Sequence, residues 1–265
     1  MCGNFLYYAI AIDNTILPAL RNISSEQYKA TTNTTKQVAK LLNYLASNPQ
    51  AEIQYRASRI QLAIHSDVSH LSVAQTRSRA SGVHFLTEGP PETENPEDFV
   101  PTTNGILLVV CKIMRNIMAS EAEAEYGTIF IKSQTAVPIR NTLSEMGWPQ
   151  GTTATQVDNS TAVGITTKEF IQNKYKEMDM RFYWINDKIK QSQFCVFWRP
   201  GPENLGYYHS KYHPPEHHRA VHSKYLHVPN ICSLQGCVDL PVRVNTTKRE
   251  SQRAKLERYF LECIS

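Results

Sequence analysis

The feature of this sequence that most constrains its fold is the order in which strand-like and helix-like segments follow one another. Three strand-like segments come first, then a helix beginning at Ser120, a strand ending at Asp158, a further amphipathic helix and a last strand. The strand-like segments are IQLAIHSD, VHFLTE, ILLVVCKIM, TTATQVD and QFCVFW. Strands that alternate with helices after an initial run of strands indicate a mixed sheet with helices on both faces. We expect the first strand to be half-buried and to end at Asp67, and Pro138 to kink or divide the helix.

Length and composition allow one sizeable domain with additional segments. The chain has 265 residues, of which 41% are hydrophobic, enough for a real core. Residues 1–55 are expected to be largely helical, because Val38, Leu41 and Leu45 share one helical face. Residues 56–215 hold the alternating segments and form the predicted α/β domain. Residues 216–265 form a tail with a basic helix.

Several classes of protein are disfavoured. No apolar run approaches the roughly 20 residues that span a bilayer, so we expect no membrane partner. The first residues lack the basic region and cleavage site of a signal peptide, and the six cysteines are scattered. We therefore expect an intracellular protein, cytoplasmic or nuclear, that is not secreted. The formal charge of +4 is compatible with a polyanionic partner but does not require one.

The start of the central helix contains three glutamates at alternate positions. Ser120 followed by Glu123 is a capping box, and acids in a first turn suit the helix dipole. This explains Glu121 and Glu123. Glu125 lies a full turn inside the helix, next to apolar residues, and no capping role explains it.

Glu125 and two aspartates form the candidate catalytic group. Asp67 and Asp158 each end a predicted strand, and ligands of open α/β sheets bind outside the carboxyl ends of strands. Three converging carboxylates need cations to stay ionised, and oxygen ligands favour a hard divalent metal such as Mg²⁺. Two such ions would activate water for hydrolysis of a phosphodiester. The alternative for either aspartate alone is a turn residue at the end of its strand.

A set of motifs also resembles the ribonuclease H region of copia-type retrotransposon polyproteins. The resemblance covers roughly residues 4–225 and rests on these segments in order: LLNYLASNP, LAIHSDVSHL, RSRASGVHFL, SEAEAEYG, VDNSTA, KEMDMRFYW and WRPGPENLGYYHSK. It implies a ribonuclease H-like fold, with a mixed five-stranded sheet whose first three strands are antiparallel and the others parallel. It implies cleavage of the RNA strand of an RNA/DNA hybrid with two Mg²⁺ or Mn²⁺ ions, held by Asp67, Glu125 and Asp158.

The same resemblance sets the context of the chain. Residues 1–55 are similar to the segment that links reverse transcriptase to ribonuclease H in these polyproteins, so the rest of such a polyprotein is an expected partner. No Tyr-X-Asp-Asp signature of a polymerase occurs in the sequence.

One position departs from the family pattern. A fourth carboxylate normally stands in the last motif, where this chain has Tyr207. A neutral phenol is a poor metal ligand, and Glu203 or His209 are the candidates to replace it. Two alternatives to an active nuclease therefore stay open: a catalytically inactive domain that still binds nucleic acid, and an integrase-type core, against which the order of the motifs argues.

Substrate contacts are expected from two polar segments. Arg77, Arg79 and Ser81 are placed in a loop between the first two strands, where they contact phosphates or form a solvated hairpin loop. Asn159 and Ser160 follow Asp158 at a helix start, where backbone N–H groups favour phosphate, although helix capping is the simpler interpretation.

The segment HSKYHPPEHHRAVH is rich in histidine and raises the question of a zinc site. Pro214 and Pro215 argue against it, because they interrupt the helix that would align ligands.

Overall fold

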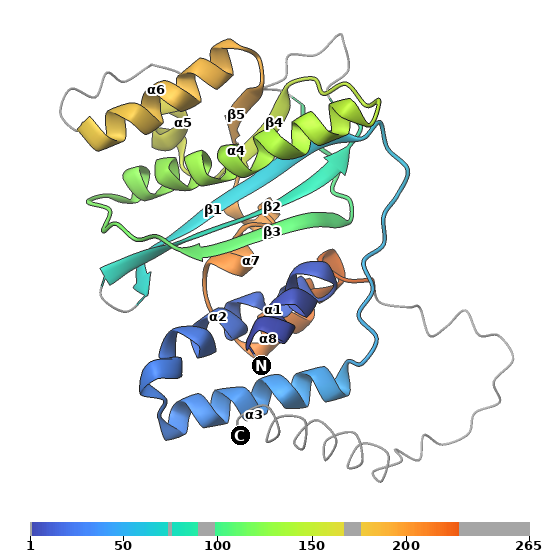
Figure 1. Cartoon of the computed structure of the whole chain (residues 1–265), viewed down its shortest axis with the longest axis vertical. Coiled ribbons are helices and arrows are strands. Elements are labelled where there is room, and N and C mark those ends of the chain that lie inside the picture. The colour runs from blue at the N-terminus through green and yellow to red at the C-terminus, as the bar shows by residue number, and fades with distance from the viewer. Residues whose placement is uncertain (1, 74–75, 90–98, 167–175, 228–265) are drawn as a thin grey trace, which may run out of the picture. The chain divides into compact units, whose positions relative to one another are not determined.

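The structure is a computed structural model that describes residues 2–73, 76–89, 99–166 and 176–227. The chain divides into two compact units (Figure 1). One comprises residues 1–53 together with the segment from Arg219 onward, and the other comprises residues 54–218. The predicted basic helix of the tail, within residues 246–264, lies outside the described residues.

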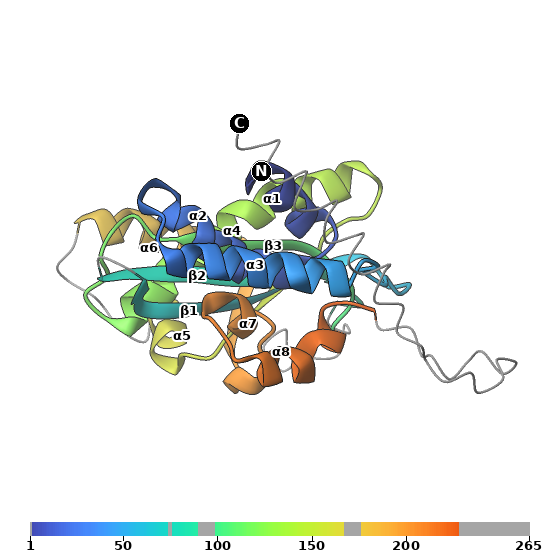
Figure 2. The ribbon, with the colours of Figure 1, turned by 90° about the horizontal axis from the view of Figure 1, so that it is seen from below.

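A five-stranded sheet forms the centre of the unit 54–218. Its strands lie in the order β3-β2-β1-β4-β5. The first three pair antiparallel, and β4 and β5 continue the sheet in parallel with β1. Figure 2 shows β3, β2 and β1 side by side. This is the mixed sheet expected of the ribonuclease H-like fold, so the prediction of fold class is confirmed. The strands are β1 (Gln61–Val73), β2 (Arg77–Thr87), β3 (Ile106–Ile113), β4 (Thr153–Val157) and β5 (Phe194–Trp198).

Helices cover both faces of this sheet. Alternate side chains of a strand point to opposite faces: Leu62 and Ile64 pack with Ala136 of the long helix α4, whereas His65 contacts the backbone of Leu205 just before α7. Helices α4 and α7 accordingly lie above and below the strands in Figure 1. The helices of this unit are α4 (Glu121–Glu145), α5 (Ser160–Thr166), α6 (Lys176–Lys190), the 3₁₀ turn η4 (Gly201–Glu203) and α7 (Tyr207–Ser210). α8 (Pro215–Val221) crosses the division between the units.

The first strand differs from the prediction in both length and burial. It does not end at Asp67 but continues to Val73, and its central residues 62–67 are all buried, because helices cover both faces. The second strand begins at Arg77, so Arg77, Arg79 and Ser81 all lie in β2 and not in a loop. The pairing of Asp67 with Ser81 and of Ser69 with Arg79 provides the reason. The backbone hydrogen bonds of a hairpin can continue through a segment of polar residues. Such a segment lacks the alternation of apolar and polar side chains from which a strand is predicted.

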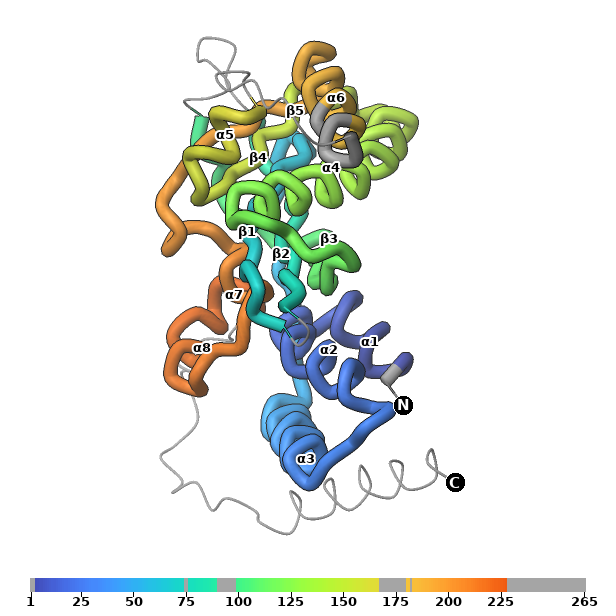
Figure 3. The backbone as a smooth tube through the Cα atoms, turned by 90° about the vertical axis from the view of Figure 1, so that its left-hand side faces the viewer, coloured from blue at the N-terminus to red at the C-terminus, as the bar shows by residue number. Residues whose placement is uncertain are grey.

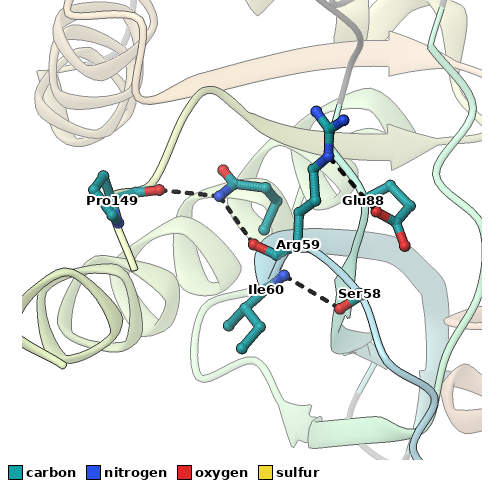
Figure 4. Close-up of polar contacts among 6 residues, drawn as sticks. Ser58, Arg59, Ile60, Glu88 and Pro149 are labelled. Atoms are coloured by element: carbon teal, nitrogen blue, oxygen red, sulfur yellow. Dashed lines mark hydrogen bonds and ion pairs between the residues drawn. The ribbon is translucent and has the colours of Figure 1, made fainter. Parts of the chain in front are cut away.

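The chain enters β1 through a tight turn at Ile60 (Figure 4). Ile60 has a positive φ of 56°, which is rare for a β-branched residue, and its backbone N–H donates to Ser58 Oγ at 3.2 Å. Beside it, the Gln61 side chain donates to the Pro149 carbonyl at 2.9 Å. Arg59 and Glu88 form an exposed ion pair at 3.9 Å, which adds little stability. These contacts fix where β1 begins relative to its neighbours.

Helix α4 runs through Pro138 without a break, so the prediction that this proline would divide the helix is wrong. A proline removes the hydrogen bond to the carbonyl four residues earlier, which here belongs to Gln134. Both Gln134 and Pro138 lie on the exposed side of the helix. Water can therefore satisfy the carbonyl, and packing of the opposite side keeps the helix continuous.

A buried lysine fills the space between α4 and the sheet. Lys132 is fully buried, and its ammonium donates to the Val110 carbonyl at 3.0 Å. Its stem crosses Gly82 of β2, where a Cβ atom would lie 2.7 Å from Lys132 Cε and would collide with the His65 carbonyl oxygen. Burial lowers the pKa of Lys132 to about 7. Gly82 is thus required by the close approach of helix and strand.

The unit that contains the amino-terminal residues is helical, as predicted. Helix α2 packs against both α1 and α3, and Figure 3 shows the three in succession. Its elements are α1 (Cys2–Ala11), η1 (Asn14–Ile16), α2 (Leu17–Glu26), η2 (Gln27–Lys29), α3 (Thr32–Ser47) and η5 (His222–Lys224). None of the described helices is long and apolar enough to cross a bilayer.

A chain of buried and partly buried hydrogen bonds holds this unit together. The Asp13 carboxylate accepts from the backbone N–H of Thr15 at 3.0 Å. The Thr15 hydroxyl lies 3.2 Å from the Tyr44 hydroxyl, which in turn lies 3.1 Å from His222 Nε2. These contacts connect residues that are far apart in the sequence, which explains why the segment after Arg219 belongs to the helical unit.

We predict that Gly82→Ala destabilises the protein by about 1–3 kcal/mol, because an added methyl group would have to displace the Lys132 stem or strand backbone. Gly151→Ala is the matched control, since its Cβ would meet only the flexible Gln61 side chain, at 3.3 Å. Urea denaturation followed by circular dichroism measures both variants. Equal stability of the two variants would contradict the tight packing at Gly82.

Candidate active site

Asp67 and Asp158 are brought together by the pairing of β1 with β4. Ala63, Ile64 and His65 of β1 pair in parallel with Ala154, Thr155 and Gln156 of β4. Continuing this register by two residues places Asp67 next to Asp158. Asp67 is buried and Asp158 is half-buried. The two predicted strand-end aspartates therefore lie at the same edge of the sheet, although β1 itself continues beyond Asp67.

Glu125 reaches the same place from the first turns of α4. The Ser120 hydroxyl accepts the Glu123 N–H at 3.1 Å, and the Glu123 carboxylate accepts the Ala119 N–H at 2.7 Å. The prediction that Ser120 caps this helix is confirmed, but the capping box is not complete, because Glu123 bonds the N–H of Ala119 and not that of Ser120. Glu125 takes no part in the cap and is only 1% exposed. The cap fixes the start of α4 and thereby the turn on which Glu125 lies.

The three carboxyl groups influence one another. Burial raises the pKa of Glu125 well above its usual range, and the negative charges of Asp67 and Asp158 raise it further. Burial likewise raises the pKa of Asp67 to about 7; Asp158 adds to the rise, while Ser210 and Lys211 oppose it. Such shifts are typical of like charges gathered in a poorly solvated place. The charges of the three predicted residues, Asp67, Glu125 and Asp158, therefore act on one another in the folded protein.

The loop between β5 and α7 passes very close to both aspartates. A Cβ atom on Gly201 would lie 3.1 Å from Asp158 Oδ2, and one on Gly206 would lie 3.1 Å from the backbone nitrogen of Asp67. Residues larger than glycine would push this loop away from the carboxylates. The two glycines of the WRPGPENLG segment therefore allow this loop to lie close to Asp67 and Asp158.

Three hydrogen bonds hold this loop against the strands. The Asn204 side-chain amide donates to the Ser66 carbonyl at 2.6 Å, and the Leu205 N–H donates to His65 Nδ1 at 3.1 Å. The Ser81 hydroxyl donates to the Gly206 carbonyl at 2.6 Å. Burial lowers the pKa of His65 to about 4, so its imidazole is neutral and Nδ1 can accept. The loop is thus fixed relative to Asp67.

Tyr207, which stands where the resemblance leads us to expect a fourth carboxylate, begins α7. Of the two residues considered as its replacement, Glu203 is exposed and His209 is fully buried, and a metal-binding role of either stays a prediction. The residues of this segment that act on Asp67 are Ser210 and Lys211. The Ser210 hydroxyl also donates to the Tyr207 carbonyl at 2.9 Å.

The five predicted substrate residues differ from one another in burial and in hydrogen bonding. Ser81 is buried and its hydroxyl is used by Gly206, and Arg79 is also buried, so of the first group Arg77 alone is partly exposed. The Asn159 side chain accepts the Ala162 N–H at 3.1 Å, which confirms a capping role at the start of α5. Ser160 is exposed. The substrate roles of all five residues stay predictions.

Sequence reasoning missed several residues that shape the site. The Trp198 indole donates to the Asp158 carbonyl at 2.9 Å although the ring is 46% exposed. Asn204, Ser210 and Lys211 lie in the quoted WRPGPENLGYYHSK segment, but its composition gives no sign of which backbone groups they would contact. Lys132 shows no sequence signal, because a lysine on a helix is normally exposed.

The chemistry of the carboxylates fits a hard cation. Asp67 Oδ2 and Glu125 Oε1 are buried and have no hydrogen-bond partner among the described residues, and buried carboxylate oxygens need a partner or a metal. The spacing is less favourable: in the described part of the chain, no three side chains of His, Cys, Asp or Glu are arranged as a ready-made metal site.

Comparison with solved structures finds distant likenesses to ribonucleases H. LC11-RNase H1, isolated from compost by a metagenomic approach, has a TM-score of 0.38 at 12% identity, covering 54% of this chain and 87% of that one. The N-terminal RNase H domain of Rv2228c from Mycobacterium tuberculosis has a TM-score of 0.35 at 14% identity, covering 55% and 86%. RNase H1 from the archaeon Halobacterium salinarum has a TM-score of 0.34 at 12% identity, covering 55% and 90%. No family model and no curated protein matches the chain.

We predict that Asp67→Asn stabilises the metal-free protein at pH 8 by about 1–2 kcal/mol, or roughly 3–6 °C in Tm. The pKa of Asp67 is higher in the folded protein than in the unfolded chain. Its contribution to stability is therefore present below about pH 4 and lost as the pH rises through about 7. The amide removes that loss, so its advantage should shrink at pH 5. Thermal melts in EDTA test this.

The exposed carboxylate of Glu145, at the end of α4, provides the control. Glu145→Gln should leave the melting temperature nearly unchanged at both pH values. A destabilised Asp67→Asn at pH 8 would show that the carboxyl groups do not repel one another in the folded protein.

Proposed function

We propose that this protein hydrolyses the RNA strand of RNA/DNA hybrids in a metal-dependent reaction, as the ribonuclease H part of a copia-type retrotransposon polyprotein. The observation that carries the proposal is the convergence of Asp67, Glu125 and Asp158 at one edge of a mixed sheet. Each stands in a motif of the resemblance, and each comes from a different element. A cation would allow all three to stay ionised in this poorly solvated place, whereas without one the raised pKa values of Asp67 and Glu125 favour their protonated forms.

The residues that would hold Mg²⁺ or Mn²⁺, with two ions expected, are these three carboxylates. When bound, the ions supply an activated water and neutralise charge on the phosphodiester in the transition state. The protein contributes positioning. Trp198 holds the Asp158 backbone, the capped start of α4 carries Glu125, and the Asn204 loop packs against Asp67. Lys211 opposes the rise of the Asp67 pKa and so favours the ionised form that binds metal.

The substrate class follows from the resemblance and from the shape of hybrids. A hybrid approaches A-form geometry and is recognised through phosphates and 2′-hydroxyls more than through base edges, so little sequence preference is expected. Arg77, Asn159 and Ser160 are the exposed or partly exposed members of the predicted substrate residues. The further proposals concern context: residues 1–55 derive from the reverse transcriptase connection, residues 56–215 form the nuclease domain, and residues 216–265 form the tail.

Tyr207 supports a second candidate function. A tyrosine in place of a carboxylate leaves three acidic ligands where the family has four, which weakens the hold on a second ion. The chain would then be a catalytically inactive domain that binds nucleic acid. The two candidates differ in whether metal-dependent cutting occurs at all.

We predict that the purified chain cuts the RNA strand of a labelled hybrid in Mg²⁺ or Mn²⁺, leaving 3′-hydroxyl and 5′-phosphate ends. Asp67→Asn, Glu125→Gln and Asp158→Asn should each lower the rate by about 100-fold or more, because each removes a charged ligand. Gel electrophoresis of end-labelled RNA measures the rate, with Glu145→Gln as the control. Cutting that persists in Asp67→Asn would refute the assigned role.

A further prediction separates the two candidates. If the enzyme is limited by one missing ligand, Tyr207→Asp should raise the cutting rate by about 10-fold or more, because a carboxylate binds Mg²⁺ and a phenol does not. Tyr207→Phe is the control and should show no gain. The absence of cutting by both the native chain and Tyr207→Asp would favour the inactive binding domain.

A further inference from the structure

The histidine-rich segment that follows the loop between β5 and α7 forms an ordered cluster of rings around a lysine. The Lys211 ammonium lies 4.0 Å from the centre of the Tyr207 ring. The Tyr207 and His213 rings are 5.2 Å apart, and His213 stacks on His217 at 4.2 Å. All four side chains are partly exposed. We call these residues, Tyr207, Lys211, His213 and His217, the Tyr207 surface.

This surface is held from behind by Tyr208. The buried Tyr208 ring stacks on His213 at 5.3 Å with an interplanar angle of 11°, and its hydroxyl lies 2.6 Å from His218 Nδ1. The Tyr207 carbonyl lies 3.4 Å from His213 Nε2. These contacts restrict the rings before any ligand arrives, which lowers the entropy lost on binding.

The Tyr207 surface borders the carboxylates. Its position is fixed by the hydrogen bonds of Asn204 and Leu205 to β1, within a few residues along the chain. Two lysines have charges that reach Asp67, namely Lys132 and Lys211. Lys132 is fully buried and its ammonium is bonded to Val110. Lys211 is partly exposed and is therefore the cation of the pair that a solvent-borne anion can meet.

A nucleic-acid strand needs such a cation in order to approach this site. Three carboxylates at the sheet edge repel a polyanion, and the phosphate backbone supplies most of the affinity of proteins for nucleic acid through lysine and arginine. Aromatic rings beside the cation offer faces on which bases or sugars can pack. The combination of one ordered ammonium with several rings differs from the dispersed lysines of an ordinary solvated surface.

We propose that the Tyr207 surface binds the sugar-phosphate backbone of a nucleic-acid strand next to the carboxylates, with Lys211 contacting a phosphate and the rings packing against the adjacent nucleotide. The inference deepens the proposed function and rests on it for the choice of nucleic acid as partner. It also gives the substitution at Tyr207 a physical meaning. Where the resemblance places a further metal ligand, this chain orients a cation toward the substrate.

The test measures binding without cleavage. Fluorescence anisotropy of a labelled RNA/DNA hybrid is followed with the full chain in EDTA, over a salt series from about 50 to 200 mM. We expect Lys211→Met to weaken binding by about 10-fold at the lowest salt and to reduce the slope of log K against log salt by about 1. Lys190→Met, at an exposed lysine at the end of α6, should change neither quantity.

A second pair of variants examines the rings. Tyr207→Phe keeps the ring that faces Lys211 and should bind like the native chain, whereas Tyr207→Ala should weaken binding by about 3-fold or more. Circular dichroism melts confirm that the variants fold.

The outcomes separate this inference from the proposed function. Unchanged affinity and salt slope in Lys211→Met would overturn the Tyr207 surface, as would a native chain that binds no hybrid. Cutting of RNA by that same chain would leave the proposed function standing. Conversely, Lys211-dependent binding by a chain that never cuts would support the surface and reject the nuclease activity.

Discussion

The parallel pairing of β1 with β4 is the interaction on which the site depends. Its register, continued by two residues, brings Asp67 of β1 next to Asp158, which directly follows β4, so two like charges meet at the edge of a sheet whose centre is buried. Glu125 adds a third from α4. The resulting repulsion and desolvation raise the pKa values of Asp67 and Glu125. The fold therefore maintains an energetically unfavourable group of carboxylates, as expected where function and not stability selects the residues.

The surroundings of the carboxylates partly compensate for this cost. Gly201 and Gly206 let the loop before α7 approach both aspartates, and hydrogen bonds from Asn204, Leu205 and Ser81 keep it there. The same loop brings Lys211 near Asp67. The loop thus affects both the packing and the charge of this edge of the sheet. The Tyr207 surface begins where the loop ends, so its position depends on the same contacts.

A second cation lies behind the site. Lys132 occupies the interior between α4 and β2, where Gly82 leaves room for its stem. A buried charged or polar group is costly unless it is hydrogen-bonded, and the Val110 carbonyl meets that need. The two lysines illustrate different uses of the same residue type. Lys132 is a satisfied part of the core, whereas Lys211 remains accessible to an anion.

The sequence by itself determined the order of strands and helices, the capped start of α4 and the identity of the candidate acids. These features depend on local periodicity, capping chemistry and short motifs, which are properties of neighbouring residues. It placed Arg77, Arg79 and Ser81 in a loop and expected Pro138 to kink or divide α4, because polar residues and proline have those local preferences. Strand pairing extended β2 through the three residues, and packing kept α4 continuous. Only the tertiary structure decided the contacts of Asn204, Trp198 and Lys132. Their partners lie on other elements, and no local pattern records which backbone groups the folded chain will bring within reach.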